Sequence, residues 1–192
     1  MKASHHLIIF LLVALLGTSC SGVKVSQDFD SATNFSKLKT FAWQSATQEK
    51  TGDIRVDNPL LDSRIREAVE QTLTENGYRR ESKETPDFYV GYELSIRTRI
   101  GSDGASTSVG FGVGGGSRSS GSFGGIGVSS GGGVQEYDEG MLVIDITDTK
   151  TKDLLWRGTA TRRISRHATP EETTQTVNEM VGKTLAQFPP QP

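Results

Sequence analysis

The sequence predicts an α+β fold, a two-layer sandwich in which two helices pack on one face of a mostly antiparallel sheet of about five strands. Five segments carry the alternating or short apolar patterns of strands, and two carry apolar residues at helical spacing. The 192 residues are 34% hydrophobic and 23% charged, which suits one globular domain. The predicted order of the elements is β-β-α-β-β-β-α.

The first two predicted strands are short. Val23, Val25 and Phe29 alternate with polar residues, which indicates a strand with one buried face. A second strand is predicted over residues 40–43, where Thr-Phe-Ala-Trp follows a polar turn. Both strands are expected to join the sheet.

Two amphipathic helices are predicted from their end signals and their periodicity. Asn58 caps the first helix, Pro59 suits its first position, and Gly77 ends it. The second helix begins with the capping box at residues 169–172 and continues toward the two prolines at 189–190. Each helix has one apolar stripe, so each is expected to cover the sheet.

The longest predicted strand covers residues 87–100. Its apolar face is made by every second residue: Phe88, Val90, Tyr92, Leu94, Ile96 and Ile100. Two more strands are predicted over residues 141–148 and 154–164, joined by a polar connector of hairpin length. Three strands of this kind predict an antiparallel centre for the sheet.

Residues 101–133 form an insert with 14 Gly and 9 Ser. We predict a flexible loop between two central strands, because glycine loses the most backbone entropy when it becomes ordered. The alternative is a β-ribbon that extends from the sheet, since Val109, Phe111 and Val113 alternate with glycine. A ribbon with a bare edge would favour self-association.

Residues 1–19 have the features of a secretory signal. Lys2 precedes an apolar run over residues 7–16, and three small residues stand before Cys20. Ten apolar residues are too few for a spanning helix, which needs about 20. We therefore predict removal of this segment rather than a transmembrane anchor.

Cys20, which directly follows the predicted signal, resembles the acceptor of a bacterial lipobox. We predict that its thiol receives a diacylglycerol and that the freed amine is acylated, for example with palmitate. Residues 20–22 would then form the lipidated N-terminus and a short tether, and residues 23–192 the single domain. The alternative is a secreted protein with a free thiol.

The composition excludes several classes of function. A single Cys and three His within one chain make no zinc finger, iron–sulfur cluster or disulfide framework. The net charge is −2, and the short basic run at residues 162–167 is predicted to be a solvated strand end, so no nucleic-acid partner is expected. We find no catalytic motif, and we assign no catalytic, cofactor-binding or metal-binding residue.

Acidic residues nevertheless cluster in the sequence around the last hairpin: Asp138, Glu139, Asp145, Asp148 and Asp153. Carboxylates can act in acid–base catalysis or bind a hard cation. We expect structural roles instead. Asp145 should face solvent or pair with Arg157 or Arg163, and Asp148 should shape the turn.

Four segments form a sequence signature specific enough to suggest a protein family: Phe41-Ala42-Trp43, the strand from Gly140 through Asp145 and Asp148, Trp156-Arg157-Gly158, and Phe188-Pro189-Pro190. With them, essentially the whole mature chain resembles a bacterial lipoprotein family called domain of unknown function 4136. The resemblance implies a place in the envelope of Gram-negative bacteria, and Ser21 implies sorting to the outer membrane. It implies no activity. We expect Trp156 to anchor the core and Gly158 to allow a close approach.

The sequence therefore predicts a non-enzymatic cell-envelope lipoprotein that binds or scaffolds other components. It would be held in the outer membrane by the lipid on Cys20, with its domain in the periplasm and with another envelope protein or a second copy as partner. No cofactor is expected. The alternative is a periplasmic hydrolase or metal-dependent enzyme that uses Asp145, Asp148 and His167.

Overall fold

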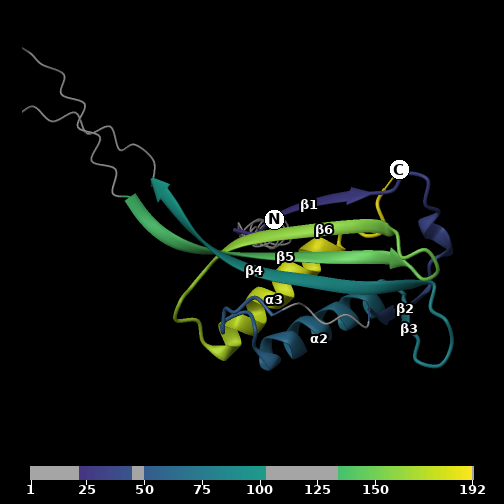
Figure 1. The fold of residues 1–192 in the computed structure, drawn as a ribbon, viewed down its shortest axis with the longest axis horizontal. Coiled ribbons are helices and arrows are strands. Elements are labelled where there is room, and N and C mark those ends of the chain that lie inside the picture. Colours follow the sequence, from purple (N-terminus) through teal and green to yellow (C-terminus); the bar gives the residue numbers. More distant parts are fainter. Residues whose placement is uncertain (1–21, 45–49, 103–133, 192) are drawn as a thin grey trace, which may run out of the picture.

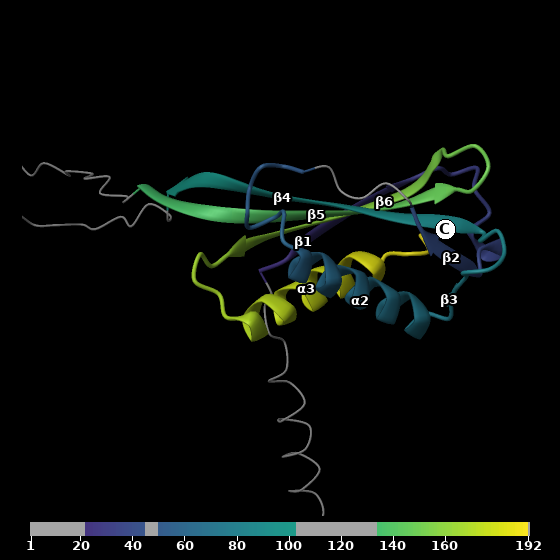
Figure 2. The ribbon, with the colours of Figure 1, turned by 60° about the horizontal axis from the view of Figure 1, so that its bottom comes forward.

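The computed structural model describes residues 22–44, 50–102 and 134–191. A six-stranded sheet and two helices form two layers, and both helices cover the same face of the sheet (Figure 1, Figure 2). The strands lie in the order β1-β6-β5-β4-β2-β3. The elements are β1 (Lys24–Phe29), the 3-10 turn η2 (Phe35–Lys37), β2 (Thr40–Trp43), α2 (Pro59–Glu75), β3 (Arg79–Arg80), β4 (Phe88–Ser102), β5 (Val134–Asp148), β6 (Leu154–Ile164) and α3 (Pro170–Leu185).

The sheet is mixed and has six strands, which corrects the prediction of about five mostly antiparallel strands. Neighbours among β1, β6, β5 and β4 are antiparallel, but β2 runs parallel to both β4 and β3. Helix α2 lies between β2 and β4 in the chain, and a crossover of this kind is what a parallel pair needs. The unpredicted strand, β3, has only two residues, too few for an alternating pattern to reveal it.

β1 is an edge strand that is less buried than the alternation predicted. All six of its residues are exposed, and Val25 and Phe29 keep 41% and 40% of their surface in solvent. The reason is its position, since β1 pairs with β6 on one side only. The expectation of one buried face is therefore wrong for this strand.

β4 and β5 extend past the rest of the sheet as a two-stranded ribbon (Figure 1). Their ladder continues to Ser102 opposite Val134, whereas β6 ends at Ile164 opposite Asp138. β5 therefore begins well before residue 141, its predicted start. Ile100, expected on the buried face, is 72% exposed because it lies on the ribbon, beyond the helical layer.

Two predicted regions lie outside the described residues. They are the signal segment with Cys20, and residues 103–133 of the glycine-rich insert. Lipidation of Cys20 and the choice between a loop and a longer ribbon therefore stay predictions.

Both helices begin where their sequence signals placed them. The Asn58 side chain accepts a hydrogen bond from Leu60 N at 2.9 Å at the start of α2. At the start of α3, Glu172 N donates to Thr169 Oγ1 at 3.2 Å and Thr169 N donates to Glu172 Oε2 at 2.8 Å. These side chains satisfy amides that have no partner within the helix, so the predicted caps are confirmed.

The core lies between the sheet and the helices and contains a group of aromatic rings. Trp156 is fully buried, and its Nε1 donates to Gln27 Oε1 at 2.9 Å. Its ring lies 5.3 Å from that of Phe188, which also contacts Tyr78 and Phe88. The prediction that Trp156 anchors the core is confirmed.

Gly158 lies directly beneath the Trp156 ring. A Cβ at residue 158 would stand 2.2 Å from Trp156 Cη2 and 2.4 Å from Thr184 Cγ2. Ordinary carbon contacts are at about 3.5–4.0 Å, so only glycine fits here. This confirms the close approach that the sequence predicted.

Candidate functional site

A groove opens between the helical layer and the sheet, at the end of the domain where the ribbon leaves. Its volume is about 570 Å³, within the range of small-molecule sites. Its apolar lining comes from both layers: Leu61 of α2, Leu94 and Ile96 of β4, and Val177 and Met180 of α3. Val177 and Met180 are buried, whereas the other three are only partly covered by the protein.

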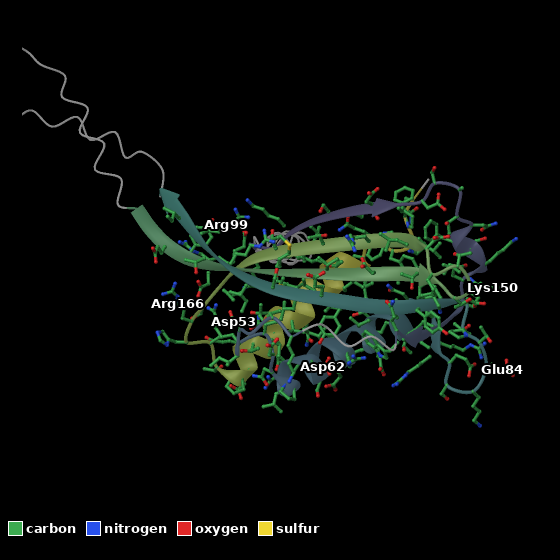
Figure 3. The ribbon with its side chains drawn as sticks, in the orientation of Figure 1. Asp53, Asp62, Glu84, Arg99, Lys150 and Arg166 are labelled. Carbon is green, nitrogen blue, oxygen red and sulfur yellow. The ribbon has the colours of Figure 1, made fainter. Side chains whose placement is uncertain are left out.

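Charged residues complete the lining of this groove: Arg55, Arg162, Arg163, Arg166, Asp138 and Glu172. Arg55 precedes α2, and Arg166 lies in the connector between β6 and α3. Arg162 and Arg163 lie near the C-terminal end of β6. Figure 3 labels Arg166 and Asp53, the neighbour of Arg55, at the same end of the molecule. The groove therefore combines an apolar interior with a rim rich in arginine.

Asp138 holds this rim together. Its carboxylate accepts hydrogen bonds from Arg55 Nη1 at 2.8 Å, from Arg166 Nε at 2.8 Å and Nη2 at 3.2 Å, and from Thr98 Oγ1 at 3.0 Å. The Asp138 side chain is only 1% exposed, while Arg55 and Arg166 are 46% and 55% exposed. We call these four residues the Asp138 clasp. It joins β4, β5, the segment before α2 and the connector before α3.

The period of β5 explains why an acid is buried here. Asp138, Gly140, Leu142, Ile144 and Ile146 occupy every second position and are all buried on the side that faces the helices. A buried carboxylate needs partners. Arg166 and Thr98, with the charge of Arg55, outweigh the effect of desolvation and lower the pKa of Asp138 to about 2.

Arg55 is itself held by a second acid. Its Nε donates to Asp53 Oδ1 at 3.0 Å and its Nη2 donates to Asp53 Oδ2 at 2.6 Å. The hydrogen bond from Arg55 is the main reason why the pKa of Asp53 is lowered. This fork fixes the guanidinium of Arg55 at the rim before any ligand arrives.

The acids of the groove are already bonded to protein donors, which leaves arginine hydrogens available. Glu172 is engaged in the cap of α3, and Asp138 accepts from three side chains. Arg166 uses Nε and Nη2 for Asp138, so its Nη1 hydrogens point away from that carboxylate. Arg162 forms an ion pair with Glu179 of α3. The groove is therefore suited to an anionic group.

A separate cluster ties α2 to the sheet beyond the groove. The Arg66 guanidinium lies 4.5 Å from the Trp43 ring and 5.9 Å from the Tyr92 ring. Tyr92 OH donates to Asp62 at 2.5 Å, and Trp43 Nε1 donates to Glu70 at 2.7 Å. Burial and the bond to Asp62 raise the pKa of Tyr92, so it stays protonated at neutral pH. Each polar group has a partner, which is what packing of α2 on the sheet requires.

The acids predicted for structural roles have those roles. Both oxygens of Asp145 accept from Arg157, at 2.7 Å from Nε and 2.7 Å from Nη2. Asp148 Oδ1 accepts from Lys150 N at 2.7 Å and Thr151 N at 2.8 Å, so it shapes the turn. Both expectations are confirmed.

The residues of the alternative enzyme prediction are not brought together. Asp148 lies at the hairpin near Lys150, whereas His167 follows Arg166 at the opposite end of the domain, as Figure 3 shows by the labels of Lys150 and Arg166. β6, with eleven residues, separates them along the sheet, a length of about 35 Å. Within residues 22–44, 50–102 and 134–191, no group of three or more His, Cys, Asp or Glu is placed to hold a metal ion.

Sequence reasoning missed the clasp. The basic run does form a solvent-exposed strand end, where Arg163, Arg166 and His167 are exposed, but Arg162 and Arg166 also form ion pairs with acids on other elements. The pattern did contain a sign of this. Asp138 continues the apolar alternation of Leu142 and Ile144, and a charged residue on a buried face implies a partner.

The sequence matches one known protein family. The family model described as "Domain of unknown function (DUF4136)" matches residues 25–190. The chain belongs to this family. No curated protein sequence matches the chain.

Two solved structures are similar to this chain at low sequence identity. A PDZ domain protein from Parabacteroides distasonis is similar at a TM-score of 0.52 and 14% identity, covering 93% of this chain and 39% of that one. The chain thus spans well under half of that protein. The PelC dodecamer from Paraburkholderia phytofirmans is similar at a TM-score of 0.45 and 11% identity, covering 85% of this chain and 96% of that one. Among the helices described, none has the length and apolar character needed to cross a membrane.

Proposed function

We propose that this DUF4136 domain is a non-enzymatic binding or scaffolding module of the cell envelope. It is anchored to the outer membrane through a lipid on Cys20, faces the periplasm, and receives its ligand in the groove. The N-terminal sequence pattern supports the anchor, and the groove supports binding.

The observation that carries the proposal is the pairing of a preformed rim with an accessible apolar interior. The Asp138 clasp fixes Arg55 and Arg166 at the rim through bonds of 2.8 Å, so these side chains lose little freedom when a ligand binds. Leu61, Leu94 and Ile96 offer partly exposed apolar surface beside them. A site that is concave, largely apolar and equipped with a few fixed polar groups is typical of ligand binding.

The enzyme alternative has weaker support. A reaction at Asp145, Asp148 and His167 needs these groups within reach of one substrate, and Asp148 and His167 lie at opposite ends of the domain. Asp145 is also committed to Arg157 through both oxygens. Binding is the function that this arrangement favours.

The first experiment compares three chains after crosslinking in cells and purification in detergent. Thr173→Trp places an indole in the groove, while Thr174→Trp adds the same ring one position along α3, outside the groove lining. The two threonines are matched, because each hydroxyl donates to the carbonyl four residues earlier, at 2.8 and 2.9 Å. We expect wild type and Thr174→Trp to capture the same envelope component and Thr173→Trp to lose it.

Equal capture by all three chains would refute the groove as the binding site. Anchoring is tested separately by growth with labelled palmitate, which should enter the wild type and not Cys20→Ala. Label in Cys20→Ala, or none in the wild type, would refute the anchor.

A further inference from the structure

We propose that the groove binds a single-chain anionic amphiphile, with its carboxylate or phosphate head at Arg55 and Arg166 and its acyl chain along the apolar lining. This inference rests on the proposed function, because it names the ligand of the same site. Three independent features of the described residues support it.

The first feature is the shape and character of the interior. Leu94 and Ile96 of β4 line one side, and Val177 and Met180 of α3 line the other. They follow the strand and the helix inward from the rim, so the apolar surface continues from the charged rim into the groove. An acyl chain gains from burial roughly in proportion to its apolar area and needs no hydrogen-bond partner along its length.

The second feature is the kind of charge at the rim. Asp138 is buried and neutralised by its partners, whereas the guanidinium groups of Arg55 and Arg166 remain about half exposed. Arg166 binds Asp138 through Nε and Nη2, so its Nη1 is the nitrogen that remains available to a ligand. Guanidinium groups match carboxylate and phosphate oxygens in geometry and charge. The acids that face these two arginines are Asp138, Asp53 at Arg55, and the exposed Glu136, whose charge acts on Arg166 more weakly than that of Asp138.

The third feature is the exposed apolar surface on the segments that carry the clasp and the groove lining. The three most exposed large apolar side chains of the described residues are Ile54 at 87%, Ile100 at 72% and Leu60 at 65%. Ile54 precedes Arg55, Leu60 precedes the lining residue Leu61, and Ile100 lies two positions from Thr98 of the clasp. Exposed apolar side chains thus lie within a few residues of the cationic rim in the chain, and this combination is one that an anionic lipid surface attracts.

The proposal commits to one amphiphile in the groove rather than to a bilayer surface. The hollow of about 570 Å³ accommodates a drug-sized ligand, which fits one chain with its head group. A bilayer alone would contact Ile54, Leu60 and Ile100 but would leave the interior unoccupied.

The test uses the full chain in neutral phosphatidylcholine nanodiscs with a palmitic acid that carries a diazirine in its tail. The matched probe is the corresponding palmityl alcohol, which has the same tail and no charge. After irradiation, mass spectrometry locates the adducts. We expect the acid to label residues of the groove lining, and Thr173→Trp but not Thr174→Trp to block this labelling.

The arginines are tested by Arg55→Gln with Arg166→Gln. Loss of charge-assisted hydrogen bonds should lower labelling by the acid about tenfold and bring it to the level of the alcohol. Arg55→Gln with Arg166→Lys, which keeps one cation at the rim, should label more than Arg55→Gln with Arg166→Gln. Arg157→Gln removes an arginine that pairs with Asp145 and does not line the groove, so it should label as the wild type does. Thermal unfolding of each variant shows whether the fold is retained.

Several outcomes would overturn the proposal. Equal labelling of the groove by the acid and the alcohol would overturn it, because the arginines would then have no role. Adducts confined to Ile54, Leu60 and Ile100 would indicate a bilayer contact instead. If no amphiphile labels the groove while Thr173→Trp still abolishes capture in cells, the ligand class is wrong and the proposed function stands. If that capture is also unaffected, both fail.

Discussion

Gly158 gives the sharpest quantitative prediction of this fold. In Gly158→Ala the new Cβ would stand 2.2 Å from Trp156 Cη2 and 2.4 Å from Thr184 Cγ2, each overlap exceeding 1 Å against an ordinary contact of about 3.5 Å. Trp156 and Thr184 are both fully buried, so neither can turn into solvent. Trp156 is also held by Gln27.

Overpacking of a core costs about 1–3 kcal/mol and occasionally more. Because two buried side chains must move, we expect a loss at the upper end, about 3 kcal/mol in the free energy of unfolding. The loss is measured by urea unfolding. The control is Gly182→Ala in α3, where no atom lies within 4 Å of the added Cβ and helix propensity should raise stability by up to about 1 kcal/mol.

A double-mutant cycle separates this overlap from other effects of the substitution. Trp156→Phe removes the ring atoms that the new Cβ would meet, so Gly158→Ala should cost about 1–2 kcal/mol less in that background. An unchanged urea midpoint for Gly158→Ala would refute the reasoning. Strict additivity of the two substitutions would show that the Trp156 ring is not the cause.

Three further predictions concern charges and caps. Because its partners lower the pKa of Asp138 to about 2, its carboxylate stabilises the folded state above about pH 4 and loses that effect as the pH falls through 2. Asp138→Asn should therefore lower the unfolding temperature at pH 7, with the gap to wild type closing between about pH 4 and 2; a constant gap contradicts this. Asn58→Ala removes the cap of α2 and should cost about 1 kcal/mol in urea unfolding. Asp145→Asn breaks an exposed pair with Arg157 and should cost under about 1 kcal/mol in the same assay, a loss above about 2 kcal/mol being inconsistent with a surface role.

The groove proposals can be examined independently of these stability measurements. Thr173→Trp and Thr174→Trp change one helix in adjacent positions, and only residue 173 lines the groove. A difference between them in cells therefore reports on the groove and not on α3 as a whole. The arginine variants then test whether the groove binds an anionic head group.

Interactions between residues close in the chain account for the local elements of this protein. Asn58 and the capping box at residues 169–172 placed the helix starts, because capping depends on neighbours in the chain. Alternation located β4 and β6, since a strand with one buried face repeats every two residues. Large aromatic and glycine residues marked the core at Trp156 and Gly158.

Other features depend on contacts between segments that are far apart in the chain. The direction of β2 follows from the path of α2, and β3 is a strand only because β2 lies beside it. The exposure of Ile100 follows from where the helices end. The Asp138 clasp joins residues 83, 40 and 28 positions away, namely Arg55, Thr98 and Arg166. A charged residue on a buried face indicates that it needs partners. Only the fold determines which side chains reach it and which groove they surround.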